Sequence, residues 1–255
     1  MRNILDLISD WIRDNNYSHG FLIIPLSIYL IFRKKEGISC RPQKGNVGFF
    51  PLILGCLGLI AGTAASEFFT IRLSLILIIT GLTICRIGLP GFKKIWFAFF
   101  MLLFMIPIPA VIYYSATFPM QLFATRTTLS VLNLIGVPAV GAGNIIHLPD
   151  YSLEVAEACS GLRSLVTLMA LAALYGYLTM RSRLGWLILF LMAIPISIIA
   201  NIFRLVITAV GAYAISTKFA DNFLHELSGV IVFIVALIMI IALGAILQWR
   251  KKPSQ

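Results

Sequence analysis

Long apolar runs that end in clusters of basic residues are the feature that most constrains the fold of this chain. A helix needs about 20 apolar residues to cross the hydrocarbon layer of a membrane, and Lys and Arg gather at its cytoplasmic end. The chain is 60% apolar and 12% charged, whereas an ordinary soluble domain is about a quarter charged. We therefore expect an integral protein of the plasma (inner) membrane. The basic clusters are 33–35 with Arg41 and Lys44, Arg86 with Lys93 and Lys94, Arg181 with Arg183, and 250–252.

Alternation of these runs with the basic clusters predicts an all-α polytopic membrane protein with about 7–8 transmembrane helices. The N-terminus is expected outside the cell and the C-terminus inside it. All acidic residues except Glu36 then fall on the outer side, which is consistent with this orientation. The seven runs that we expect to cross are 20–32, 47–65, 71–85, 95–115, 162–178, 184–215 and 230–247.

Two runs leave the number of crossings open. Residues 118–137 are apolar enough to enter the bilayer, but Arg126 and the two threonines that follow it argue against a full crossing. Residues 184–215 would form ~48 Å of helix at 1.5 Å per residue, which is longer than one crossing requires. We expect one span there that continues into an outer extension, broken or tilted near Pro195 or Asn201.

Outside the spans the sequence predicts a small amount of surface structure. Residues 1–16 place apolar and charged side chains at helical spacing, which is typical of an amphipathic helix lying on the membrane surface. Residues 116–158 are expected to form an extracytoplasmic segment, with a small hairpin over 144–155 around a Pro149-Asp150 turn. The whole chain, 1–255, is expected to be one domain with no additional soluble C-terminal domain.

The net charge of +10 does not indicate a nucleic-acid partner. The basic residues flank the apolar runs and are not interleaved with exposed aromatic residues. We therefore expect them to anchor helices at the membrane lipid rather than to contact a phosphate backbone.

Cys159 is the one cysteine that this topology places on the outer side. It stands at the expected start of a helix, with Arg163 four residues further on and over the same face. A helix N-terminus and a nearby cation both favour the thiolate, which is the nucleophilic form of cysteine. Two alternatives remain: an intermolecular disulfide, or an inert cysteine beside Ser160, which caps the helix, and Gly161, which allows close packing.

Arg204 and His225 are expected at the same depth as Cys159. Arg204 lies in a long apolar run one helical turn after Asn201, and a charged residue there is costly and usually functional, unless it snorkels to the headgroups. A loop histidine such as His225 is more often a surface residue than a catalytic one. Together, however, a cysteine and a histidine supply a nucleophile and its base, and an arginine can stabilise an oxyanion.

A metal site is the main competing interpretation of these residues. Three histidines and Cys159 are all assigned to the outer side, but none of them forms a ligand pair at helical or loop spacing. We therefore expect no metal and no cofactor. The three histidines are His19, His147 and His225.

Several short motifs together resemble the exosortase/archaeosortase family. Their order and spacing, in a polytopic chain of this length, carry the resemblance, and the likeness extends along nearly the whole chain. The motifs are Tyr17-Ser18-His19-Gly20 followed by Pro25, the Phe104–Pro109 and Gly141–Asn144 segments, Ala158-Cys159-Ser160-Gly161-Leu162-Arg163, Asn201-Ile202-Phe203-Arg204, and His225 followed by Gly229.

The resemblance implies a membrane-embedded cysteine transpeptidase or endopeptidase whose catalytic residues are Cys159, Arg204 and His225. Such enzymes are thought to face the extracytoplasmic side and to cleave C-terminal sorting signals made of a short motif, a transmembrane helix and a basic tail, as in PEP-CTERM proteins. The acyl group passes through a thioester to an acceptor. The implied partners are membrane-anchored protein substrates, with a link to exopolysaccharide machinery. Arg163, Asn201, Ser160 and Gly161 would support the site, and His19, Tyr151 and Glu157 would bind substrate.

Two other classes of function stay open at this point. A membrane transporter would use Arg204 as a counter-ion for its substrate and would tolerate replacement of Cys159, but transporters show two related halves with interrupted helices. A structural component of an exopolysaccharide export system would need none of the three residues individually.

Overall fold

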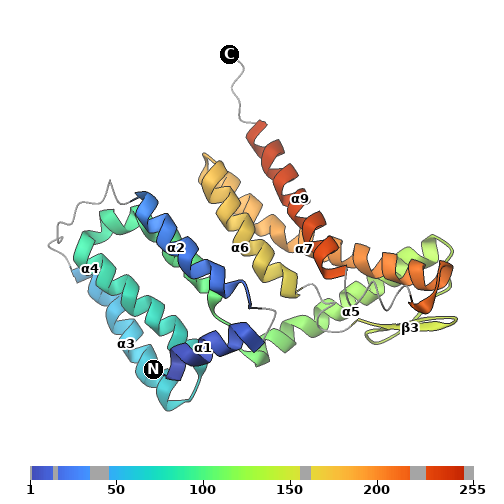
Figure 1. Cartoon of the computed structure of the whole chain (residues 1–255), viewed down its shortest axis with the longest axis horizontal. Helices are drawn as coiled ribbons and strands as arrows, with labels where there is room; N and C mark the ends of the chain where they lie inside the picture. The colour runs from blue at the N-terminus through green and yellow to red at the C-terminus, as the bar shows by residue number, and fades with distance from the viewer. Residues whose placement is uncertain (1, 14–16, 35–45, 156–161, 219–227, 250–255) are drawn as a thin grey trace. The chain divides into compact units, whose positions relative to one another are not determined.

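The computed structural model describes residues 2–13, 17–34, 46–155, 162–218 and 228–249. Within these ranges the chain is mostly helical, with one small sheet (Figure 1). It divides into two compact units, Met1–Pro109 and Ala110–Gln255. Each unit has its own set of packed helices, and each is described by itself below.

The described residues of the first unit form four α-helices and two short 3₁₀ helices. Helices α3 and α4 form an antiparallel pair whose backbones approach closely. A Cβ atom placed on Gly81 would lie 2.6 Å from the backbone nitrogen of Leu52, so only glycine fits there. The elements are α1 (Arg2–Arg13), α2 (Gly20–Lys34), η2 (Asn46–Gly48), α3 (Phe49–Ala64), α4 (Phe68–Leu102) and η3 (Leu103–Met105).

Helix α4 is kinked at Gly88, whose φ of 72° and ψ of 166° are not helical. Glycine adopts this conformation without a steric penalty, and Pro90 two residues later cannot donate a backbone hydrogen bond. The part of α4 before the kink contains the expected run 71–85. The expected helix over 95–115 is wrong, because the chain leaves the helical conformation at 106–109. Pro107 and Pro109 account for the break, since proline disfavours a helical conformation in the residue before it.

The amphipathic helix expected at the N-terminus is present as α1. Its apolar face is buried through Leu7 and Trp11, and the Trp11 Nε1 donates a hydrogen bond to the carbonyl of Met105 at 2.9 Å. On its polar face, Asp10 pairs with the buried Arg72 of α4 at 2.6 Å. The position of α1 on a membrane surface stays a prediction.

Four α-helices and a three-stranded antiparallel sheet are described in the second unit. The expected hairpin is confirmed: β2 and β3 pair with Ile146 opposite Leu153, and Pro149 and Asp150 form the turn. Strand β1, which extends the sheet on the other side of β2, was not expected. The elements are α5 (Ala110–Leu134), β1 (Val140–Ala142), β2 (Ile145–Leu148), β3 (Tyr151–Glu154), α6 (Leu162–Thr179), α7 (Arg183–Ala214) and α9 (Ser228–Trp249).

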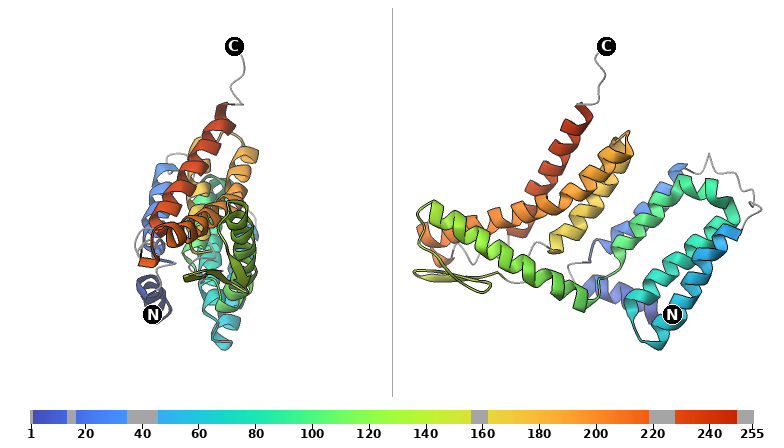
Figure 2. Two further views of the ribbon diagram at one scale, coloured as in Figure 1. Left: turned by 90° about the vertical axis from the view of Figure 1, so that its right-hand side faces the viewer. Right: turned by 180° about the vertical axis from the view of Figure 1, so that it is seen from behind.

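Helix α7 runs without interruption for 32 residues. Of the two expectations near Pro195 or Asn201, a break or a tilt, the break is wrong, whereas the ribbon does change direction part-way along its length (Figures 1 and 2). A proline inside a helix removes one backbone hydrogen bond and commonly bends the helix without ending it. Its first half packs against α6 and α9 through a core of aliphatic residues that includes Leu168, Leu189 and Ile240.

The apolar helices support an integral membrane protein. Among the described residues, three helical segments are long and apolar enough to cross a membrane: Phe68–Met105, Arg183–Ala214 and Gly229–Trp249. Two shorter helical segments, Phe49–Ala64 and Leu165–Thr179, are also apolar. The number of seven or eight crossings stays a prediction.

Candidate active site

A stripe of buried polar residues follows one face of α7. Ser197, Asn201, Arg204 and Thr208 recur every three or four residues, which places them on the same side of the helix. All four are buried, with exposed fractions between 0% and 7%. The opposite face of this part of α7 carries apolar residues such as Phe203, which is 51% exposed. A helix with its polar face turned inward and its apolar face outward is suited to a lipid environment.

Helix α5 carries a second buried polar stripe and packs against α7. Ala124 and Leu132 of α5 belong to the same buried cluster as Leu205 of α7. The exposed face of α5 carries large apolar residues such as Val111 and Phe118, and also the charged Arg126. We call the two stripes together the polar seam. Its members on α5 are Thr117, Gln121, Thr125 and Thr128.

Most threonines of the polar seam bond to their own helix. The hydroxyls of Thr117, Thr125 and Thr208 donate to the carbonyl four residues earlier, at 2.6, 2.9 and 2.9 Å. Such bonds satisfy a buried hydroxyl without a partner from another helix. Among the residues of the second unit whose burial the structure describes, a set that leaves out Arg163, Arg204 is the one charged side chain that is buried.

Arg204 lies far along α7 from the basic cluster at its start. At 1.5 Å per residue, Arg204 is ~32 Å along the helix axis from Arg183. This length is close to the ~30 Å thickness of a bilayer's hydrocarbon layer. The side chain is only 7% exposed, so Arg204 is enclosed by protein rather than extended as a snorkelling arginine would be. A guanidinium held in this way offers a fork of N–H donors to an anionic group.

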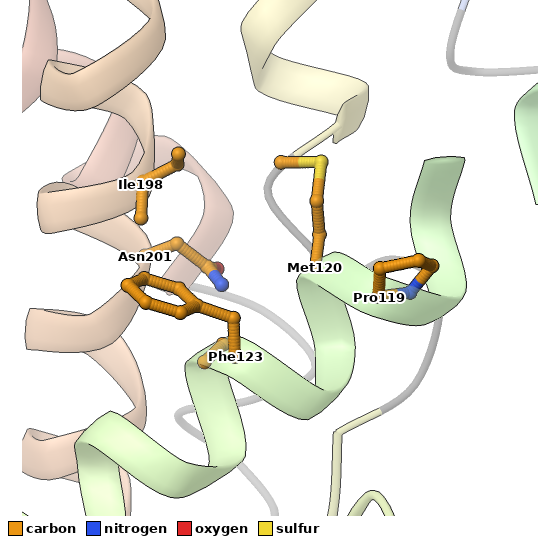
Figure 3. Close-up of a pocket in the computed structure, with 6 residues that line it drawn as sticks. Pro119, Met120, Phe123, Ile198 and Asn201 are labelled. Carbon is orange, nitrogen blue, oxygen red and sulfur yellow. The ribbon is translucent and has the colours of Figure 1, made fainter. Parts of the chain in front are cut away.

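A pocket of about 320 Å³ opens between α5 and α7, one helical turn before Arg204. The amide of Asn201 points into the space between the two helices, beside the ring of Phe123 and facing Met120 (Figure 3). Apart from this amide, the wall is apolar. The pocket can therefore hold an apolar side chain while the amide bonds to a polar group next to it. Its lining residues are Pro119, Met120, Phe123, Ala124, Ile198 and Asn201.

The sheet covers the second half of α7, near Arg204. Leu153 and Val155 are fully buried in the cluster that contains Leu205, and Tyr151 packs against the same cluster. On the outer face of the sheet the His147 ring and the Ser152 hydroxyl form a hydrogen bond at 2.9 Å. Tyr151, one of the expected substrate-binding residues, therefore lies on the element that adjoins the half of α7 carrying Arg204.

Comparison with protein families decides which family this arrangement belongs to. The family model described as transmembrane exosortase (Exosortase_EpsH) matches residues 11–242. The chain belongs to the transmembrane exosortase family. No curated protein and no solved structure matches it. The family resemblance expected from the motifs is thereby confirmed, and the match includes the positions of all the expected site residues.

Several expected residues of this exosortase lie outside the described residues. These are Glu157, Cys159, Ser160, Gly161 and His225. Helix α6 begins at Leu162, three residues after Cys159, and Arg163 is its second residue. The roles of Cys159 and His225, and their distances to Arg204, stay predictions.

His19 lies in the first unit of the exosortase, where it contributes to a structural contact. Its Nε2 is 3.0 Å from the carbonyl of Phe104, and because a carbonyl only accepts, the ring nitrogen donates. The neighbouring Tyr17 hydroxyl accepts from the backbone N–H of Ile108 at 3.1 Å. These two hydrogen bonds attach residues 104–108, at the end of the first unit, to the residues just before α2. A role of His19 in substrate binding stays a prediction.

The polar seam is the part of the candidate site that the sequence analysis missed. Gln121 and Ser197 were not expected to contribute, although the spacing of 117, 121, 125 and 128 places four polar residues on one helical face. The signal was present, but residues 116–158 were expected to form an extracytoplasmic segment outside the spans, so this helical spacing was not considered. Among the described residues, no group of three or more His, Cys, Asp and Glu side chains could hold a metal ion.

Proposed function

We propose that this exosortase is a membrane-embedded cysteine transpeptidase or endopeptidase that cleaves C-terminal sorting signals of exported proteins. The observation that carries the proposal is the buried Arg204, which lies one helical turn beyond a largely apolar pocket in a member of this family. An oxyanion needs a fixed cationic or N–H donor in a water-poor environment, and a buried guanidinium is suited to this role.

The reaction begins with attack of the Cys159 thiolate on the scissile carbonyl carbon. A C–S bond forms, the carbonyl π electrons move to oxygen, and Arg204 stabilises the oxyanion. Collapse of this intermediate breaks the C–N bond, and His225 gives its proton to the leaving amine. A thioester remains on Cys159, while the transmembrane helix and basic tail of the substrate are released.

The second half of the reaction transfers the acyl group. An amine acceptor, or water, attacks the thioester, and His225 now takes the proton from this nucleophile. The new C–N or C–O bond forms as the C–S bond breaks, which regenerates the thiolate. Arg163 and the start of α6 favour the thiolate over the thiol, and Ser160 and Gly161 shape the turn before that helix.

Substrate binding uses the pocket beside Asn201. An apolar residue of the sorting signal enters between Met120 and Phe123, and the Asn201 amide bonds to the adjoining peptide group. Tyr151 and Glu157 contribute on the outer side, together with His19. The enzyme acts in the inner membrane on the extracytoplasmic side, and its partners are membrane-anchored substrates of an exopolysaccharide-linked system.

The test is co-expression with a tagged protein that bears a motif, a transmembrane helix and a basic tail. We expect the wild type to remove the tail, Cys159→Ala to leave the substrate intact at equal enzyme abundance, and the mass of the new C-terminus to identify the acceptor. Cys56→Ala is the matched control, because Cys56 is exposed on α3 in the first unit. Full processing by Cys159→Ala or Cys159→Ser would overturn the mechanism, because cleavage would then not depend on this cysteine. An unprocessed substrate with both the wild type and Cys159→Ala would contradict the proposed activity on this signal and favour the transporter interpretation.

A further inference from the structure

A second pocket, of about 520 Å³, lies at the end of α7 opposite to Arg204. The end of α6, the start of α7 and the end of α9 meet there, and both views of the ribbon place these three ends together (Figures 1 and 2). None of its residues belongs to the candidate active site. Its lining residues are Thr179, Met180, Arg181, Ser182, Leu184, Gly185, Ile188, Ala245, Leu247, Gln248 and Trp249.

The wall of this pocket has a polar part and an apolar part. Arg181, Gln248 and Trp249 supply N–H donors, whereas Leu184 and Ile188 supply an aliphatic surface. In the part of the chain that the structure describes, the one ion pair is that of Arg72 with Asp10, so Arg181 has no carboxylate partner there. The sequence around the pocket contains no candidate for one, since residues 158–220 and 227–255 include no Asp or Glu.

The pocket also lies at the ends of two helices that are able to cross a membrane. The candidate spans Arg183–Ala214 and Gly229–Trp249 begin and end, respectively, beside it. Arg250, Lys251 and Lys252 follow in the sequence. Exposed Arg and Trp side chains at the end of a span are typical of the headgroup level, where positive residues attract anionic lipids.

We propose that this pocket binds the headgroup of an anionic phospholipid. The Arg181 guanidinium binds the phosphate in a charge-assisted pair, and Gln248 and Trp249 donate to the headgroup oxygens. The upper part of an acyl chain then covers Leu184 and Ile188. A free phosphate would leave this aliphatic surface uncovered, which is why the pocket fits a lipid better than a small anion.

The test is native mass spectrometry of the full chain in detergent, with phosphatidylglycerol or phosphatidylcholine added. We expect phosphatidylglycerol to bind about tenfold more tightly, and Arg181→Gln to remove this preference. Arg183→Gln is the matched control, since it removes the same charge from the next exposed arginine, which does not line the pocket. It should change the affinity less than twofold.

A second variant tests the acyl-chain part of the site. Ala245→Phe adds a ring to the wall while leaving Arg181 in place, and it should weaken phosphatidylglycerol binding at least fivefold without lowering the melting temperature. Equal binding of both lipids, equal effects of Arg181→Gln and Arg183→Gln, or displacement of the lipid by millimolar inorganic phosphate would overturn the proposal. Because Cys159→Ala should bind the lipid like the wild type, failure here is distinguishable from failure of the proposed enzyme mechanism.

Discussion

The two units of the molecule bury polar residues in different ways. In the first unit the buried polar side chains of the described residues are Ser27, Arg72 and Ser74, and Arg72 is paired with Asp10 and lies 5.7 Å from the centre of the Phe68 ring. In the second unit eight polar residues are buried along the polar seam, and Arg204 lies among them beside a pocket. Arg72 therefore joins two helices, whereas the role that we propose for Arg204 is to bind the substrate's oxyanion. Under the proposed function, a buried arginine of the second unit stabilises the oxyanion, whereas the buried arginine of the first unit has a structural role.

Replacement of each buried arginine by lysine tests whether the two residues have different roles. Arg204→Lys should lower the rate of substrate processing at least ~100-fold at unchanged abundance, since loss of an oxyanion donor costs about 10²–10³ in rate and a lysine does not reproduce the guanidinium fork. Arg72→Lys should retain the processing rate per folded molecule. A wild-type rate for Arg204→Lys, measured with the co-expressed tagged substrate, would remove Arg204 from the mechanism.

A glycine in the first unit should affect stability and leave the chemistry unchanged. Gly81→Ala forces a Cβ against the backbone of Leu52, and we expect a loss of about 1–3 kcal/mol in the free energy of unfolding. Processing per folded molecule should not change. Gly229→Ala is the control, because its Cβ would meet nothing within 4 Å, and thermal unfolding in detergent measures both. A loss of turnover in folded Gly81→Ala would show that the first unit contributes to the reaction and not only to stability.

The sequence was informative where a residue contradicts its surroundings. Arg204 and Asn201 stand out because they interrupt an apolar run, and the hairpin stands out because Pro149-Asp150 separates two alternating segments. Strand β1 could not be predicted, since three residues that include a glycine carry no alternation and pair only because β2 is there to receive them. The turn residues that form the hairpin are visible in the local sequence, whereas the formation of β1 depends on its pairing with β2.

The start of α5 was missed for a different reason. Hydropathy averages over residues 95–115, and the apolar character continues through Ile106-Pro107-Ile108-Pro109 even though the backbone cannot remain helical there. Taken alone, the polar stripe of α5 predicts a solvent-exposed helix face. It is buried because α5 packs against α7. Which faces are buried depends on partners distant in sequence, so a single helix pattern does not determine it.

Thr128 offers a smaller test within the polar seam. Its side chain is fully buried, and its hydroxyl has no hydrogen-bond partner among the described residues. Thr128→Val keeps the shape and removes the unsatisfied group, so we expect the free energy of unfolding to rise by about 1 kcal/mol. Thr117→Val, which loses a bond to the Tyr113 carbonyl, should not be stabilising. If thermal unfolding ranks the two variants in the reverse order, the Thr128 hydroxyl has a stabilising partner.

The smallest expected effect concerns the cap of α4. Hydrogen bonding from Thr70 holds the pKa of Glu67 below its ordinary value of 4.5, because the charged carboxylate accepts from the backbone of Phe69 and Thr70. A lowered folded-state pKa contributes stability that is present above pH 4.5 and is lost as the pH falls through the lowered value. Glu67→Gln should therefore lower the free energy of unfolding by roughly 0.5 kcal/mol at pH 7. The two proteins should converge in unfolding experiments at strongly acidic pH; a constant difference would contradict the role of the charge.

One uninterrupted helix, α7, carries the proposed lipid site at its start and Arg204 ~32 Å further along. Although α7 changes direction part-way along its length (Figures 1 and 2), its continuous backbone links the position of its first residue to that of its twenty-second. If the lipid headgroup fixes Arg181, the length of the acyl chains in the bilayer decides whether the guanidinium stands just outside the hydrocarbon layer or is drawn into it. Turnover should then pass through an optimum as acyl chains are lengthened in reconstituted vesicles, which would make the enzyme a gauge of membrane thickness.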